Sequence, residues 1–201
     1  LAKPDMHAPG MPERLAEAAR RLHMARPFAN DFDLFRLMHA YAAVLTSDRM
    51  PLPAGFATLA PRLAEMEQAA EAHRLPPRPC SNDLVPENLI DDNGRLWIVD
   101  YGYSGNNDPC SELGNASCES SYDEAEMTAL CAGYFGRADA RLLARMHLYA
   151  IMSDVAWSLW SVIQEHVSDL PIDFRAYGNQ RWERALGILN GPDVESWIRQ
   201  A

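Results

Sequence analysis

The sequence predicts a mainly helical α+β lobe with one central β-hairpin. Apolar residues recur at helical spacing in the first 75 residues and again from about residue 109. Between these two regions, short apolar runs flank Asn93-Gly94, a dipeptide that favours a tight hairpin turn. The 201 residues, of which 48% are apolar, are sufficient for one domain with a full core.

Three helices are predicted in the first region. Each segment repeats apolar residues at positions i, i+3 and i+4. Pro12 lies near the start of the first helix, where a missing N–H does no harm, and we expect Asn30-Asp31 to cap the second. A proline-rich stretch, "RLPPRP", then ends the helical pattern. The predicted helices cover residues 12–25, 33–45 and 58–73.

The hairpin is the next predicted element. Its strands are "NLIDD" and "RLWIV", and Asn93-Gly94 forms the two-residue loop, because a type I′ turn needs positive φ at both positions. With this loop, Asn88 faces Val99 across the ribbon. Asp100 follows Val99, so it lies at the open end of the hairpin.

The chain must turn at Asp100. Strict alternation along a strand would direct this side chain to the face opposite Asn88. We expect Gly102 and Gly105 to permit the turn, because glycine adopts conformations that other residues avoid. Asp83 lies on the loop that precedes the hairpin, so the open end collects two carboxylates and a carboxamide.

The remaining chain is predicted to be helical. Asp123 and Glu126 have the spacing of a capping box at the start of one helix. The predicted helices cover about 109–119, 123–135, 138–167 and 174–189, with a short one after Pro192.

Charge and composition restrict the class of ligand. The formal net charge is -10, which favours cationic ligands and divalent metal over nucleic acid. No apolar stretch approaches the length of a membrane span, so we expect no membrane insertion and a cytoplasmic location. The four cysteines form no C-x-x-C pair, and we expect reduced thiols. The six histidines are scattered, and none is assigned a role.

Asp83, Asn88 and Asp100 supply hard oxygen ligands of the kind that Mg²⁺ prefers. A carboxylate held off the metal could instead accept a proton from a hydroxyl nucleophile. The alternative is that these residues only cap turns, which aspartate and asparagine often do. Their order, Asp-x4-Asn, a hairpin and then Asp-aromatic-Gly, is the layout of a kinase catalytic loop and its metal-binding aspartate.

The segment "SNDLVPENLIDDNGRLWIVDYGYSGNNDP" resembles the catalytic segment of the choline/ethanolamine kinase family, within the wider aminoglycoside phosphotransferase group. The resemblance implies a protein-kinase-like C-terminal lobe and ATP-dependent phosphorylation of the hydroxyl of choline or a related amino alcohol. It implies that Asp83 is the catalytic aspartate and that Asn88 and Asp100 bind Mg²⁺. Further similar segments are "RRLHMARPFANDFDLFR", "SELGNASCES" and "WSLWSVIQEHVSDLPIDFRAY", whose Trp-x2-Trp is the most diagnostic for choline-type members.

Two positions depart from the family pattern. Ser81 stands where the family has a histidine that usually braces the catalytic loop, so activity could be intact, weakened or lost. Glu112 replaces the usual aspartate, which keeps the negative charge but places it on a longer side chain.

Trp157 and Trp160 lie three residues apart, so they share one helix face with Asp154 and Gln164. Both tryptophans could be core residues, but their polar neighbours argue against a fully apolar helix face. Aromatic rings also attract quaternary ammonium groups, which favours a binding role. The resemblance implies a choline pocket that includes this pair, and Tyr103 and Tyr122 are weaker candidates for it. The residues assigned to substrate binding are Glu112, Glu119, Trp157, Trp160 and Tyr177.

Lys3 is the only lysine in the chain, whereas kinases place an N-lobe lysine on the nucleotide phosphates. We therefore expect residues 1–201 to be the C-terminal lobe alone, with the N-terminal nucleotide lobe of the same protein as its partner.

Two other functions stay open. One is an aminoglycoside or other sugar-hydroxyl kinase, whose polycationic acceptors usually call for acidic pockets. The other is a catalytically impaired pseudokinase or binding module, which Ser81 motivates.

Overall fold

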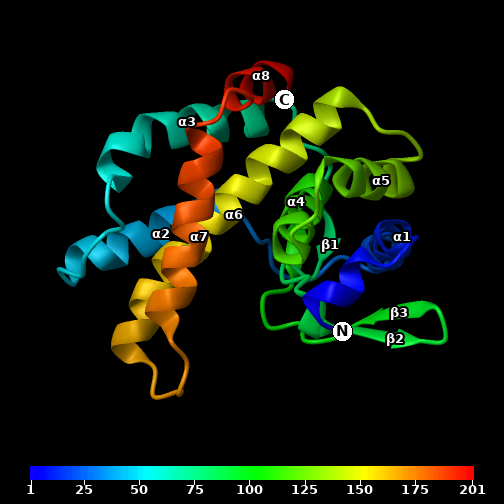
Figure 1. The fold of residues 1–201 in the computed structure, drawn as a ribbon, viewed down its shortest axis with the longest axis horizontal. Coiled ribbons are helices and arrows are strands. Elements are labelled where there is room, and N and C mark those ends of the chain that lie inside the picture. The colour runs from blue at the N-terminus through cyan, green and yellow to red at the C-terminus, as the bar shows by residue number, and fades with distance from the viewer.

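The computed structural model describes residues 1–201 and has the predicted order of helices around a hairpin (Figure 1). Two short 3₁₀ turns, Lys3–His7 and Pro86–Asn88, add to these elements. The helices are α1 (Met11–His23), α2 (Leu34–Ser47), α3 (Phe56–Ala72), α4 (Pro109–Ser120), α5 (Glu124–Phe135), α6 (Ala140–Val167), α7 (Phe174–Leu189) and α8 (Val194–Gln200). The strands are β1 (Arg78–Cys80), β2 (Leu89–Asp92), β3 (Arg95–Ile98) and β4 (Gly105–Asn107).

Helix α6 forms the centre of the lobe and packs against α2, α4, α7 and α8 (Figure 1). Every residue from Leu148 to Leu159 is buried, so this stretch is enclosed on all sides. Although α6 has 28 residues, neither it nor any other helix combines the length and apolar character that crossing a membrane requires. Its buried middle gives the lobe a rigid axis that carries Trp157 and Asp154.

Two glycines allow α4 and α7 to approach α6 closely. A Cβ atom at Gly114 would lie 2.5 Å from the carbonyl oxygen of Met146. A Cβ atom at Gly178 would lie 1.8 Å from the hydroxyl oxygen of Ser161. Both distances are too short for real atoms, so larger residues there would push these helices away from α6.

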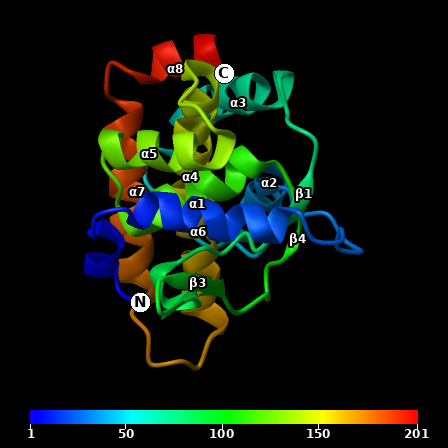
Figure 2. The same cartoon turned by 90° about the vertical axis from the view of Figure 1, so that its right-hand side faces the viewer.

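The hairpin has the predicted register. Leu89 pairs with Ile98, and the backbone N–H of Val99 donates to the carbonyl of Asn88 at 2.9 Å. Asn93 and Gly94 have φ values of 51° and 91°, as a type I′ turn requires. Figure 2 shows α1 lying across the lobe between this hairpin and helices α4 and α5.

A second antiparallel ribbon, β1 with β4, was not predicted from the sequence. It also explains a wrong capping prediction. The backbone of Asn30 and Asp31 pairs with Asn106 of β4, so this dipeptide cannot start the next helix. Helix α2 is instead capped by Asp33, whose side chain accepts a hydrogen bond from the N–H of Arg36 at 3.0 Å.

Candidate active site

Asp100 makes the turn at the open end of the hairpin by itself. Its φ of 59° lies in the left-handed region, whereas neither Gly102 nor Gly105 has a positive φ. The prediction that these glycines provide the turn was therefore wrong. Aspartate tolerates this conformation because its short side chain bonds locally, and here Asp100 Oδ1 accepts from the N–H of Gly102 at 3.1 Å. The exposed carboxylate is thus held at the end of the ribbon.

Asp83 and Asn88 are in direct contact. The amide nitrogen of Asn88 donates to Asp83 Oδ2 and to the Asp83 carbonyl, both at 3.0 Å. These two bonds fix the orientation of the carboxylate and use the nitrogen of Asn88, leaving its amide oxygen for another ligand.

The carboxyl group of Asp83 lies in a negatively charged neighbourhood. Burial and the charges of Glu119 and Asp100 raise its pKa to about 6, although the bond from Asn88 and the charge of Arg181 lower it. The mutual repulsion of these carboxylates would be relieved by a cation bound among them. Carboxylate and carboxamide oxygens in this environment fit Mg²⁺.

A cluster of aromatic side chains extends across α6 and α7. The ring centroids of Trp157 and Trp160 are 5.8 Å apart, and the two rings are nearly perpendicular. Trp160 also contacts Phe174 at 5.6 Å and Tyr177 at 6.1 Å. Trp157 is only 4% exposed, whereas Trp160 and Tyr177 are half-buried. The rings of Trp160 and Tyr177 are therefore more accessible to a ligand than the ring of Trp157.

Tyr103 links this aromatic cluster to the carboxylates. Its ring and that of Trp157 are nearly perpendicular, with a centroid distance of 5.0 Å. Burial raises the pKa of Tyr103, and the charges of Asp83 and Asp100 raise it further. The weaker sequence candidate Tyr103 thus lies between the two groups, whereas Tyr122 lies beside His7 at a centroid distance of 6.0 Å.

Glu119 and Asp154 are both paired with arginine side chains, Asp154 through both carboxylate oxygens and Glu119 through Oε1. Arg181 donates to Glu119 Oε1 and, at 3.1 Å, to Asp154 Oδ1. Its guanidinium group also lies over the ring of Tyr177, 4.6 Å from the centroid. Arg184 completes the pairing of Asp154, which is 1% exposed. Sequence reasoning missed both arginines, because a helical pattern does not indicate which charges become paired.

Glu112 does not lie in the aromatic cluster to which substrate binding was assigned. It is 1% exposed, and its two carboxylate oxygens face the backbone N–H of Asn82 and the ring of His23. Each oxygen thus has a protein partner, and the substrate-binding role of Glu112 stays a prediction. Ser81 is fully buried, and its hydroxyl group has no hydrogen-bond partner.

Comparisons with known proteins give a consistent result. Residues 1–132 match the family model described as choline/ethanolamine kinase. The protein LicA of Haemophilus influenzae is 28% identical over 119 residues, which cover 56% of this chain and 43% of that protein. The chain therefore matches less than half the length of this curated relative.

Solved structures show similarity over a larger part of the chain. A choline/ethanolamine kinase family protein from Mesorhizobium loti is 33% identical, with a TM-score of 0.93, over 100% of this chain and 70% of that one. The choline kinase LicA from Streptococcus pneumoniae is 25% identical, with a TM-score of 0.78, over 94% of this chain and 66% of that one. The predicted protein-kinase-like fold is thereby confirmed.

Proposed function

Because the chain belongs to the choline/ethanolamine kinase family, we propose that its full-length protein transfers the γ-phosphoryl group of ATP to the hydroxyl of choline or a related amino alcohol. The observation that carries this proposal is that Tyr103 contacts Trp157 of the aromatic cluster and lies near enough to Asp83 for the charge of that carboxylate to raise the pKa of the Tyr103 hydroxyl. Aromatic faces attract an alkylated ammonium group, while a carboxylate can accept the proton of a hydroxyl group. An ATP-coupled assay of the full-length protein with choline tests it.

Each residue has a distinct role in this proposal. Asp83 accepts the proton of the acceptor hydroxyl, and the hydrogen bond from Asn88 holds its Oδ2 in place. The oxygens of Asn88 and Asp100 would hold Mg²⁺, which would partly neutralise the charge of the phosphoryl group that ATP donates. Trp160, with Tyr177 beside it, receives the cationic end of the acceptor.

The nucleotide phosphates also need a protein cation. Lys3 is the only lysine in residues 1–201, and the Mesorhizobium loti structure extends beyond the part that this chain matches. We propose that a nucleotide lobe of the full-length protein supplies this cation.

The metal role predicts a change in magnesium dependence. Asn88→Ala and Asp100→Ala should each raise the Mg²⁺ concentration for half-maximal activity about tenfold or more, because each removes an oxygen ligand at the open end of the hairpin. Asp92→Ala is the matched control, since Asp92 is an exposed carboxylate at the other end of the same hairpin. If Asn88→Ala and Asp100→Ala have the magnesium requirement of the control, the open end has no metal role.

The acceptor role predicts a change in KM for choline. Trp160→Leu removes a half-buried aromatic face worth about 0.5–2 kcal/mol to a bound cation, so KM for choline should rise several-fold with little change in Tm. Trp157→Leu should raise KM similarly but also lower Tm, because Trp157 is only 4% exposed.

Trp182→Leu provides the control for packing. Trp182 is buried on α7, and its indole N–H donates to the carbonyl of Ala54 at 3.1 Å, outside the aromatic cluster. This variant should lower Tm and leave KM for choline unchanged. A Trp160→Leu protein with a lowered Tm and a normal KM would show that Trp160 is a packing residue only.

A further inference from the structure

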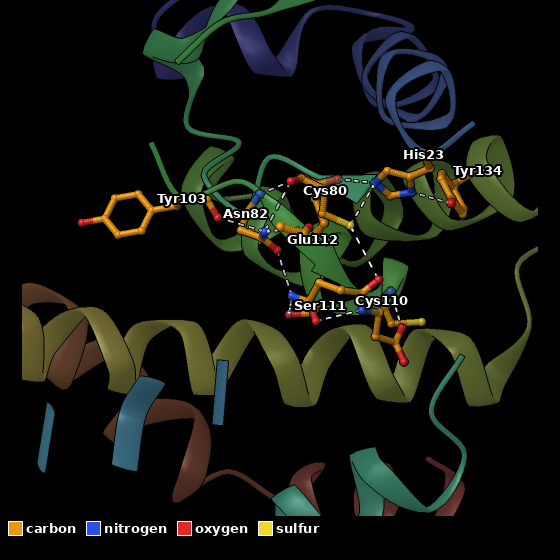
Figure 3. Close-up of polar contacts among 11 residues, drawn as sticks. His23, Cys80, Asn82, Tyr103, Cys110, Ser111, Glu112 and Tyr134 are labelled. Atoms are coloured by element: carbon orange, nitrogen blue, oxygen red, sulfur yellow. Dashed lines mark hydrogen bonds and ion pairs between the residues drawn. The ribbon is translucent and has the colours of Figure 1, made fainter. Parts of the chain in front are cut away.

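A buried chain of hydrogen bonds lies beneath the catalytic segment and has no role in the function proposed above (Figure 3). The hydroxyl of Tyr134 on α5 is 2.5 Å from His23 Nδ1 on α1. The other ring nitrogen of His23 contacts Glu112 Oε2 on α4. Glu112 Oε1 accepts a hydrogen bond from the backbone N–H of Asn82 at 2.9 Å. Three helices are thus connected to the residue that precedes Asp83.

Asn82 has a left-handed backbone conformation and is bonded to several neighbouring segments. Its φ of 60° lies in a region that asparagine adopts more readily than most residues, and hydrogen bonds to three other segments fix it here. Its side chain accepts from the amide of Asn107 at 2.9 Å and donates to the carbonyl of Tyr103 at 3.1 Å. The bond from its N–H to Glu112 completes this support, and Asp83 is the next residue along the chain.

The role of Glu112 in turn depends on His23. Glu112 is 1% exposed, and a buried carboxylate needs a partner for its charge. Within ion-pair distance, that partner is His23, which is 3% exposed and comes from a different helix. Without His23, one oxygen of Glu112 would be left buried and unpaired, and its orientation toward Asn82 would no longer be fixed.

The side chain of Ser81, which precedes Asn82, does not help to hold this segment in place. Ser81 is fully buried, and its hydroxyl makes no hydrogen bond. We infer that His23 is a positioning residue, which acts through Glu112 and Asn82 to hold the Asp83 segment in its reactive geometry. That the held geometry is a reactive one rests on the proposed phosphotransferase function.

The same side chains resemble a metal site, since ligand atoms of His23, Cys80 and Glu112 lie within 4.8 Å of one another. The contacts favour the hydrogen-bonded arrangement. Both ring nitrogens of His23 already have protein partners.

Three variants of the full-length protein test the inference. His23→Phe keeps an aromatic ring but removes both hydrogen bonds. His23→Gln keeps an amide that can donate to Glu112. Leu15→Ala is the matched control, because Leu15 is a fully buried residue of the same helix with no part in the buried chain of hydrogen bonds.

We expect His23→Phe to lower kcat about 10- to 100-fold, with KM for choline and ATP changed less than about threefold, because a small displacement of Asp83 impairs the reaction more than binding. His23→Gln should recover much of this loss. Leu15→Ala should lower Tm without lowering kcat at temperatures where the protein stays folded. If His23→Phe lowers Tm as Leu15→Ala does and keeps a normal kcat, His23 is structural only.

Hydrogen exchange provides a readout that does not need activity. In a peptide that covers residues 80–83, the backbone amides should exchange faster in His23→Phe than in Leu15→Ala at matched stability. If the wild-type protein phosphorylates no acceptor, the proposed function fails, and this exchange difference still decides whether His23 holds the segment. Equal exchange in the two variants would overturn the inference. Stoichiometric zinc in the purified wild-type protein that is lost in His23→Phe would also overturn it, in favour of a metal site.

Discussion

Asp83→Asn should lower the turnover number for choline phosphorylation in the full-length protein about a thousandfold, a loss within the range for a positioned general base. Asparagine keeps the size of the side chain and an oxygen that accepts the bond from Asn88. It cannot accept the proton of the acceptor hydroxyl. KM for ATP should change little, which an ATP-coupled assay measures together with kcat.

The stability of the same variant shows whether the loss comes from chemistry or from unfolding. Burial first, and then the charges of Glu119 and Asp100, raise the pKa of Asp83 from 3.8 to about 6. The folded protein therefore binds this proton more tightly than the unfolded chain does, and ionisation of Asp83 destabilises the fold by about 2–3 kcal/mol above pH 6. This penalty decreases as the pH falls from 6 towards 4.

In magnesium-free buffer, Asp83→Asn should accordingly raise Tm at pH 8 and raise it much less at pH 4.5. A variant that is inactive and melts lower at both pH values is destabilised by the substitution, and its activity loss then says nothing about the base. Near-normal turnover in a well-folded variant would remove Asp83 from the catalytic role.

The second large effect concerns stability. Arg145 and Asp108 form an ion pair with an N···O distance of 2.6 Å, and both side chains are 0% exposed. Asp108 also accepts bonds from the N–H groups of Leu75 and Cys110, so the pair connects α4 and α6 to the segment after α3. Arg145→Met should lower the free energy of unfolding by about 3–5 kcal/mol, because it leaves a buried charge without its partner.

Chemical denaturation of matched variants measures this effect. Arg74→Met is the control, since Arg74 pairs with Asp33 and Glu71 on the surface, where an ion pair contributes at most about 1 kcal/mol. The double variant Arg145→Met with Asp108→Asn should lose less than the sum of its two single losses, because it leaves neither charge unpaired. Equal losses in Arg145→Met and Arg74→Met would contradict a structural role for the buried pair.

Local sequence signals predicted the helices and the hairpin well. Helix α7 has the predicted bounds, and α5 begins with the capping box of Asp123 and Glu126. The register of the hairpin followed from Asn93-Gly94, because a two-residue type I′ loop leaves only one pairing. These features depend on neighbouring residues, so they can be read from the chain in order.

Features that join distant segments could not be predicted in this way. The β1–β4 ribbon pairs residues more than 20 positions apart, and no single turn joins its two strands directly. The contact of His23 with Glu112 spans 89 positions, and a single histidine on an amphipathic helix does not indicate its partner. Sequence reasoning therefore assigned no role to His23.

The candidate site shows the same limit. Asp83, Asn88 and Asp100 were predicted to gather because the hairpin brings them together, and their roles stay predictions. The pairing of Glu119 with Arg181 depends on how α4 and α7 pack, and the sequence did not indicate it. The sequence could not show whether Trp157 is buried in the core or faces a ligand, because aromatic residues at helical spacing are compatible with both positions. In the structure its side chain is almost completely buried.

One measurement tests the central claim most directly. The full-length protein is incubated with ATP and Mg²⁺ and with choline, ethanolamine or an aminoglycoside, and phosphorylated acceptor is quantified beside the Asp83→Asn variant. We expect phosphorylation of choline or ethanolamine that Asp83→Asn abolishes, and no comparable product from the aminoglycoside. Phosphorylation of the aminoglycoside alone, or no product from any acceptor, would contradict the account of an amino-alcohol kinase built on Asp83.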